Sequence, residues 1–276
     1  METFGSRLRT ALDTRGPLCV GIDPHPALLA SWGLSDDLAG LERFSFTAVE
    51  ALADRVAVLK PQSAFFERFG SRGIAILESI IRQSRQAGGL VLLDVKRGDI
   101  GSTMSAYASA YLDPDSALSV DAITVSPFLG VGSLRPAFDL AATYGRGVFV
   151  LALTSNPEGP AVQHAVGADG RSVAQTVIDE ISQLNAGAEP LGSIGAVVGA
   201  TIGRTGHDLS KINGALLAPG LGAQGGDPAG LREIFGESLR NVLPSYSREV
   251  LSAGPDIAAL RAAADRAEAA CRAVIG

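Results

Sequence analysis

Eight short runs rich in Val, Ile and Leu recur along the chain, and helical patterns separate most of them. The runs are Leu18–Asp23, Val56–Lys60, Leu90–Lys96, Ala122–Val125, Val148–Thr154, Ser193–Gly199, Gly214–Pro219 and Asn241–Pro244. Segments typical of helices include Gly73–Gln86, Thr103–Tyr111, Ser172–Leu184, Leu231–Phe235 and Ile257–Ile275. Apolar strands that alternate with helices predict a parallel sheet covered on both faces. An open doubly wound sheet gives a similar pattern, so the count of eight favours an α/β fold of the (β/α)8 TIM-barrel type.

The length and composition are consistent with one domain. The chain has 276 residues, of which 46% are hydrophobic and 33 are glycine, which suits a compact protein with many tight connections. Single barrels commonly have about 250 residues, and no Pro/Ser-rich linker interrupts this sequence. We therefore expect a single TIM-barrel domain over residues 1–276.

The net charge of the chain limits the kinds of partner that it can bind. A net charge of −6 argues against broad binding to nucleic acid or to an anionic membrane, although a local cationic pocket for one phosphate stays possible. The first residues resemble an amphipathic helix rather than a signal peptide, and no apolar run is long enough to span a bilayer. These features predict a cytoplasmic protein. Cys19 and Cys271 lack metal or redox spacing, which favours two unpaired thiols.

Polar side chains gather where the predicted strands end. They are Asp23 at the first strand, Lys60 at the second, Asp94 and Lys96 at the third, Ser126 after the fourth, Ser155 after the fifth and Gln224 after the seventh. In TIM barrels the active site lies at this end of the strands. Alternation of side chains along the third strand puts Asp94 and Lys96 on one face, with Val95 on the other. A charge pair at this position predicts an active site.

The third strand also carries a specific motif. Asp94, Lys96 and Asp99 form Asp-x-Lys-x-x-Asp, which continues as Ile100-x-x-Thr103. Supporting segments lie at 21–24 (Gly-Ile-Asp-Pro), 59–67, 218–227 and 245–248. With these motifs the chain resembles, over nearly its whole length, the longer bacterial branch of the orotidine 5′-monophosphate decarboxylase family.

The resemblance implies a homodimeric barrel that converts orotidine 5′-monophosphate to uridine 5′-monophosphate in pyrimidine biosynthesis, without metal or organic cofactor. It implies that Lys96 donates the proton, and that Asp94 and Asp99 hold its ammonium group, with Lys60 joining the same network. The loop from Asp99 to Thr103 would complete the active site of the neighbouring subunit.

The resemblance also assigns substrate contacts. Asp23 and Lys60 would bind ribose hydroxyls, with Thr103 of the partner chain adding a contact and Ile100 lying in the same substrate-binding loop. Ser155 would read the edge of the pyrimidine, Pro219 would line the base pocket, and the loop after Pro219 would close as a lid. Gln224 and Arg248 would hold the phosphate, because a guanidinium makes paired hydrogen bonds to phosphate oxygens. The stretch 244–249 departs from the regular strand-to-loop transition that the family pattern predicts around Arg248.

Other interpretations stay open from the sequence. The charged motif could be a structural layer of ion pairs, or could belong to a sugar-phosphate decarboxylase or aldose-phosphate synthase that uses a metal-stabilised enediolate. A Schiff-base aldolase and an inactive nucleotide-binding module are further alternatives. His25, His164 and His207 are scattered, which favours solvated or structural roles, and the segment 203–209 is expected to be a loop.

Overall fold

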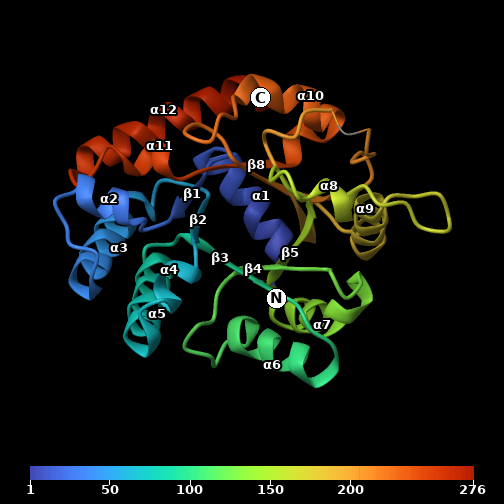
Figure 1. Ribbon diagram of the computed structural model, residues 1–276, viewed down its shortest axis with the longest axis horizontal. Coiled ribbons are helices and arrows are strands. Elements are labelled where there is room, and N and C mark those ends of the chain that lie inside the picture. The colour runs from blue at the N-terminus through green and yellow to red at the C-terminus, as the bar shows by residue number, and fades with distance from the viewer. Residues whose placement is uncertain (205) are drawn as a thin grey trace.

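The computed structural model describes residues 1–204 and 206–276, and its parallel strands close into a barrel (Figure 1). Each strand pairs with the next, and β8 pairs with β1 to close the ring. The strands are β1 Cys19–Ile22, β2 Val58–Pro61, β3 Leu90–Arg97, β4 Ala122–Val125, β5 Gly147–Leu153, β6 Gly192–Val198, β7 Gly214–Pro219 and β8 Val242–Tyr246. The predicted TIM barrel is therefore confirmed, and every predicted run contributes a strand.

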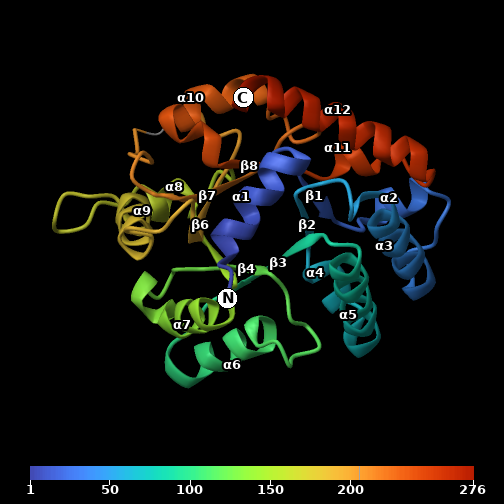
Figure 2. The ribbon, with the colours of Figure 1, turned by 180° about the vertical axis from the view of Figure 1, so that it is seen from behind.

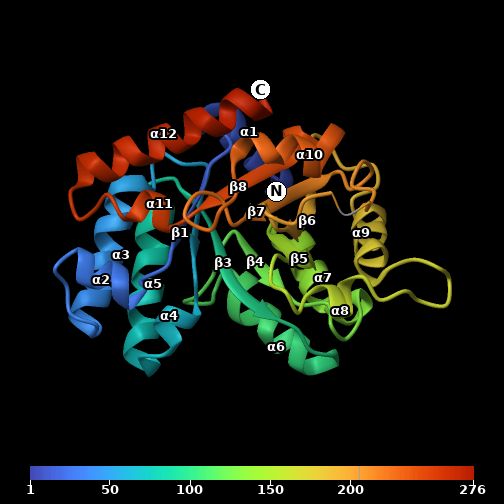
Figure 3. The ribbon, with the colours of Figure 1, turned by 45° about the horizontal axis from the view of Figure 1, so that its top comes forward.

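Helices cover the outside of this barrel (Figures 1 and 2). The helices before β5 are α1 Phe4–Arg15, α2 Pro26–Ser31, α3 Leu38–Leu52, α4 Ala64–Glu67, α5 Gly70–Gln86, α6 Gly101–Leu112 and α7 Arg135–Tyr144. The later ones are α8 Pro160–Gln163, α9 Val173–Leu184, α10 Leu231–Phe235, α11 Arg248–Leu251 and α12 Ile257–Ile275. Short 3-10 turns lie at Val131–Leu134, Pro228–Gly230 and Gly236–Asn241. Helix α12 lies along the outside of the barrel beside α3 and α11 (Figure 3).

Helix α1 closes the end of the barrel where the strands begin (Figure 2). Its Phe4 packs edge-on against Phe149 of β5, with ring centroids 6.0 Å apart, and both rings are buried. Gly195 of β6 makes room for this packing, because a Cβ there would lie 2.6 Å from the Phe149 ring. The floor of the barrel is therefore apolar, which leaves the opposite end, at the carboxyl ends of the strands, for polar groups.

Both cysteines are free, as the sequence predicted, and both are buried. Burial raises the pKa of the Cys19 thiol to about 12 and that of Cys271 to about 11. Both thiols therefore stay protonated and unreactive near neutral pH. Among the described residues, no helix is both long and apolar enough to cross a membrane.

Candidate active site

One carboxylate, that of Asp94 on β3, binds two lysines. Lys60 Nζ of β2 donates to Asp94 Oδ2 at 3.2 Å, and Lys96 Nζ donates to Oδ1 at 2.6 Å. Lys60 and Asp94 are buried, with exposed fractions of 6% and 9%, whereas the side chain of Lys96 is 45% exposed. The two side chains that the sequence placed on one face of this strand are therefore in contact. One lysine is a buried partner, and the other is accessible to a ligand.

The electrostatics keep these groups charged. Burial alone would raise the pKa of Asp94, but the two ammonium groups and hydrogen bonds from Lys96 and Thr124 lower it to about 2. Burial alone would lower the pKa of Lys60, but the carboxylates of Asp94 and Asp23 raise it above its ordinary value. The site therefore holds an ionised carboxylate beside a protonated lysine at neutral pH.

A cavity of about 280 Å³ opens beside this network at the carboxyl ends of the strands. Six of the predicted site residues line it: Asp23, Lys60, Asp94, Pro219, Gln224 and Arg248. Arg248 begins α11 one residue after β8, so a short helix replaces the expected strand-to-loop transition. The structure thus brings Gln224 and Arg248, the residues predicted to bind phosphate, to the same cavity as Lys60 and Asp94.

The wall of the cavity that carries Gln224 is a glycine-rich turn. Gly220 and Gly225 adopt φ values of +105° and +94°, which residues with a Cβ rarely adopt. The turn is closed by hydrogen bonds from Gly226 N to Gly220 O and from Gly225 N to Gly222 O, at 2.9 and 2.7 Å. These glycines fold the chain back on itself, so that Gln224 stands at the cavity edge.

Four other predicted residues, and Lys96 itself, lie outside the lining of this cavity. Asp99 Oδ1 accepts a hydrogen bond from the N–H of Ile100, and Ile100 is 62% exposed. Thr103 lies in the first turn of α6 and is also exposed, and Ser155 follows β5. The roles predicted for Asp99, Ile100 and Thr103 are contacts with the active site of a second chain, whereas the role predicted for Ser155 is a contact within its own chain.

Sequence reasoning missed several groups of the site. His25 lines the cavity and packs on Phe65 with ring centroids 4.3 Å apart, and Thr124 of β4 donates to Asp94 Oδ1 at 2.7 Å. Gln62, Ser245, Tyr246 and Ser247 also line the cavity; they belong to the supporting segments 59–67 and 245–248, but sequence reasoning assigned them no role of their own. His25 directly follows the Asp23-Pro24 motif, which could have pointed to it, whereas Thr124 is hidden in an apolar run.

Two of the three histidines that are scattered in the sequence lie together in the structure. His164 and His207 lie with ring centroids 5.5 Å apart, and His207 Nε2 is 2.9 Å from Ser172 Oγ. Burial and His164 lower the pKa of His207. Distant parts of the chain meet here through packing, which residue spacing does not reveal. One residue of the predicted 203–209 loop, Thr205, lies outside the described residues.

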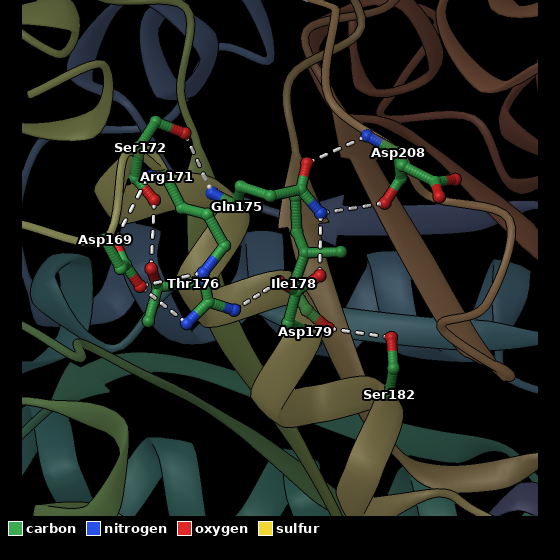
Figure 4. Close-up of polar contacts among 9 residues, drawn as sticks. All are labelled: Asp169, Arg171, Ser172, Gln175, Thr176, Ile178, Asp179, Ser182 and Asp208. Atoms are coloured by element: carbon green, nitrogen blue, oxygen red, sulfur yellow. Dashed lines mark hydrogen bonds and ion pairs between the residues drawn. The ribbon is translucent and has the colours of Figure 1, made fainter. Parts of the chain in front are cut away.

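The start of α9 holds this neighbourhood together (Figure 4). Ser172 accepts from the N–H of Gln175 at 3.1 Å, and the Gln175 side chain accepts from Asp208 N at 2.9 Å and donates to Asp179 at 2.8 Å. The predicted 203–209 loop is therefore more than a connection, because its His207 and Asp208 contact the first turn of α9 and its N-cap.

Within residues 1–204 and 206–276, no three His, Cys, Asp or Glu side chains group as metal ligands would. The closed (β/α)8 barrel and the charged cavity at the carboxyl ends of its strands place this protein in the class of TIM-barrel enzymes.

The chain belongs to the family described as orotidine 5'-phosphate decarboxylase / HUMPS, which it matches over residues 16–263. It is 74% identical over 275 residues to the orotidine 5'-phosphate decarboxylase of Salinispora arenicola, covering 100% of this chain and 99% of the relative. The Streptomyces coelicolor relative of the same name is 67% identical, and 96% of each chain is covered. The predicted enzyme class, a decarboxylase and so a lyase, is confirmed.

Solved structures agree with this placement. A crystal structure from Streptomyces avermitilis superposes with a TM-score of 0.97 at 64% identity, covering 100% of this chain and 96% of that one. The structure of Leishmania donovani OMP decarboxylase superposes with a TM-score of 0.75 at 31% identity, covering 99% and 98%. The barrel fold and the family therefore come from independent comparisons.

Proposed function

We propose that this chain, acting as one domain over residues 1–276, converts orotidine 5′-monophosphate to uridine 5′-monophosphate and CO2 in pyrimidine biosynthesis. The observation that carries the proposal is the cavity that joins the Lys60–Asp94–Lys96 network to Gln224 and Arg248. One end of this cavity suits the reacting ring, and the other suits a phosphate. The names of the relatives specify the substrate.

Lys96 is the proposed proton donor. When the bond from C6 to the carboxylate breaks, its electron pair stays on C6 in the plane of the ring, where the π-system cannot absorb it. The Lys96 ammonium group stabilises that charge and then transfers a proton to C6, after which solvent reprotonates the amine. The half-exposed Lys96 side chain and its 2.6 Å contact with Asp94 support this role. A protonated lysine thus supplies the stabilisation that an electron-sink cofactor would otherwise provide.

Asp94 has a second proposed effect, on the ground state. A substrate carboxylate held about 4 Å from the Asp94 carboxylate would be repelled by about 4 kcal/mol at an effective dielectric constant near 20. This repulsion is relieved when CO2 leaves. The low pKa of Asp94 supports the effect, because the group stays ionised.

The ribose and phosphate contacts follow from the cavity lining. Asp23 Oδ1 is buried and lacks a hydrogen-bond partner among the described residues, so it is suited to accept from a ribose hydroxyl, with Lys60 beside it. Gln224 and the Arg248 guanidinium would hold the phosphate. Pro219 would pack on the base and Ser155 would bind its polar edge.

A second copy of the chain completes the proposed active site. Ile100, Phe128 and Leu129 are 62%, 79% and 52% exposed, and the loops that carry them follow the neighbouring strands β3 and β4. Three large apolar side chains exposed on neighbouring loops favour a protein–protein interface at this end of the barrel. In this homodimer, Asp99, Ile100 and Thr103 would reach the neighbouring cavity.

The dimer proposal is tested by mixing inactive variants. Asp99→Ala and Lys96→Ala subunits, mixed and allowed to exchange, form heterodimers in which one of the two sites is intact. Random exchange of equal amounts should restore about a quarter of wild-type activity. If the mixture stays as inactive as its components, the shared site is refuted.

The reaction is tested by the fall in ultraviolet absorbance when purified protein meets orotidine 5′-monophosphate, with and without EDTA. We expect loss of substrate that EDTA leaves unchanged and that Lys96→Ala abolishes. A reaction that requires metal would favour the sugar-phosphate enzymes instead. Covalent trapping of a substrate by borohydride would favour the aldolase, and binding without turnover would favour an inactive module.

A further inference from the structure

The pairing of β3 with β4 is irregular where the site is built. Leu93 pairs with Ile123, and Arg97 pairs with Val125. Asp94, Val95 and Lys96 therefore stand opposite the single residue Thr124, which makes a β-bulge. Lys96 lies at the end of this bulge with φ of +45°, a left-handed conformation that lysine rarely adopts. The backbone at the proposed proton donor is thus strained.

The Thr124 hydroxyl lies inside the bulge and makes three contacts. Its Oγ1 accepts from the N–H groups of Val95 and Lys96, both at 3.0 Å, and donates to Asp94 Oδ1 at 2.7 Å. A hydroxyl has one donor and two acceptor positions, so all of them are used. Thr124 is 1% exposed, so water is not available to replace these bonds.

We propose that Thr124 is a positioning residue for decarboxylation, because its hydroxyl fixes the bulge that points Lys96 and Asp94 toward the substrate. The inference rests on the proposed function, since it takes Lys96 as the proton donor. Without the hydroxyl, two buried N–H groups lose their acceptor, and the strained Lys96 backbone is free to relax toward an extended conformation. That relaxation would turn the lysine side chain away from the reacting carbon.

The chemistry of the position supports this role. Ala122, Ile123 and Val125 fill the rest of β4 with apolar side chains, and valine at 124 would occupy nearly the same volume as threonine. A buried hydroxyl is favourable there because it meets the unpaired N–H groups of the bulge and the acceptor Oδ1 of Asp94. Thr124 therefore links the backbone that carries Lys96 to the carboxylate that holds its ammonium group.

The test compares Thr124→Val, which removes the hydroxyl, with Thr124→Ser, which keeps it. Ser84→Ala is the matched control, because Ser84 is also fully buried and its hydroxyl bonds only the Ile80 carbonyl of its own helix at 2.7 Å. These three variants and the wild type are assayed with orotidine 5′-monophosphate well below their melting temperatures. Crystal structures of wild type and Thr124→Val report the φ angle of Lys96.

We expect Thr124→Val to lower kcat about 10- to 100-fold while KM stays within about threefold, because a small displacement of a catalytic group costs rate and Thr124 does not line the cavity. Thr124→Ser should restore kcat to within about threefold of wild type, and Ser84→Ala should match wild type. Lys96 should leave the positive φ region in the valine variant. If that variant fails to fold, Thr124→Cys, whose thiol is a weak acceptor, takes its place with the same expectations.

Three results would overturn the inference while leaving the proposed function intact: an active wild type with unchanged kcat in Thr124→Val, failure of serine to rescue, or an equal loss in Ser84→Ala. A wild type that does not decarboxylate the substrate would instead refute the proposed function itself. The two failures are therefore distinguishable in one set of assays.

Discussion

Replacing Asp94 with asparagine should destabilise the whole barrel. The side chain of Lys60 is buried, and its ammonium group bonds Asp94 Oδ2, while Lys96 bonds Oδ1. Asparagine keeps the shape of the side chain but has one acceptor oxygen and one donor NH2 group. One of the two lysines must then face a donor, and the buried Lys60 loses the carboxylate to which it is hydrogen-bonded, keeping only the charge of Asp23 nearby.

The magnitude follows from burial. The pKa of Asp94 falls from 3.8 to about 2, which corresponds to a contribution of about 2 kcal/mol from the ionised carboxylate. Removing one partner of a buried ion pair usually costs more, about 3–5 kcal/mol, because the remaining charge stays desolvated. The larger range applies here since Lys60 is 6% exposed. For a protein of this size, such a loss lowers Tm by roughly 6–20 °C.

Differential scanning calorimetry at pH 7 measures the effect. Asp36→Asn is the control, because Asp36 also pairs with a cation, Arg68, but the two side chains are 40% and 35% exposed. Exposed pairs contribute little, so this control should melt near wild type. Adding Lys60→Met to Asp94→Asn should raise Tm again by removing the buried charge. The reasoning is refuted if Asp94→Asn melts with the control, or if Lys60→Met lowers Tm further.

Three further predictions follow from the same structure. The Tm difference between wild type and Asp94→Asn, measured by calorimetry, should shrink as pH falls from about 4 to 2. The stabilisation by the ionised Asp94 is complete above pH 3.8 and is lost as the pH drops through the pKa of Asp94 in the folded protein. A Tm difference that stays constant over this range would contradict the prediction. Arg248→Ala should raise KM about 10- to 100-fold in steady-state assays, through loss of a charge-assisted phosphate contact, and a fall in kcat alone would argue against it. Phe149→Ala should cost about 3–5 kcal/mol in urea unfolding, because it empties the barrel interior, and a loss below about 1 kcal/mol would show that the interior refills.

Much of the barrel could be predicted because its strands are buried on both faces and therefore read as apolar runs. The bounds predicted for Leu231–Phe235 and Ile257–Ile275 agree with α10 and α12. The last strand was predicted to start one residue early, since Asn241 belongs to a 3-10 turn, and to end two residues early, at Pro244 instead of Tyr246. Runs of apolar residues fix the presence of a strand better than they fix its ends.

The candidate site was predictable where motif residues lie at or near the carboxyl half of a strand, as Asp23, Lys60 and Asp94 do. The bulge in β3 was not, because alternation assumes a regular strand and carries no sign of a left-handed Lys96. The role of Thr124 was hidden for the same reason, since its partners are backbone N–H groups that no residue pattern displays. Contributions of Asp99 and its loop stay predictions, because they need a second chain.

Because Asp94 binds two lysines, its carboxylate can stay ionised beside the proposed proton donor throughout the proposed catalytic cycle. Lys60 binds Oδ2 from a buried position, and Asp94 and Asp23 raise its pKa, so it stays protonated throughout. In the proposed proton transfer from Lys96 to C6, Asp94 loses one of its two cationic neighbours but remains ionised beside Lys60. In the proposed cycle, solvent then returns a proton to the Lys96 amine, which re-forms its 2.6 Å contact with Asp94 Oδ1. In this proposed cycle Lys60 is the group that keeps Asp94 ionised after Lys96 has given up its proton, a role that an uncharged residue of the same size would not fill.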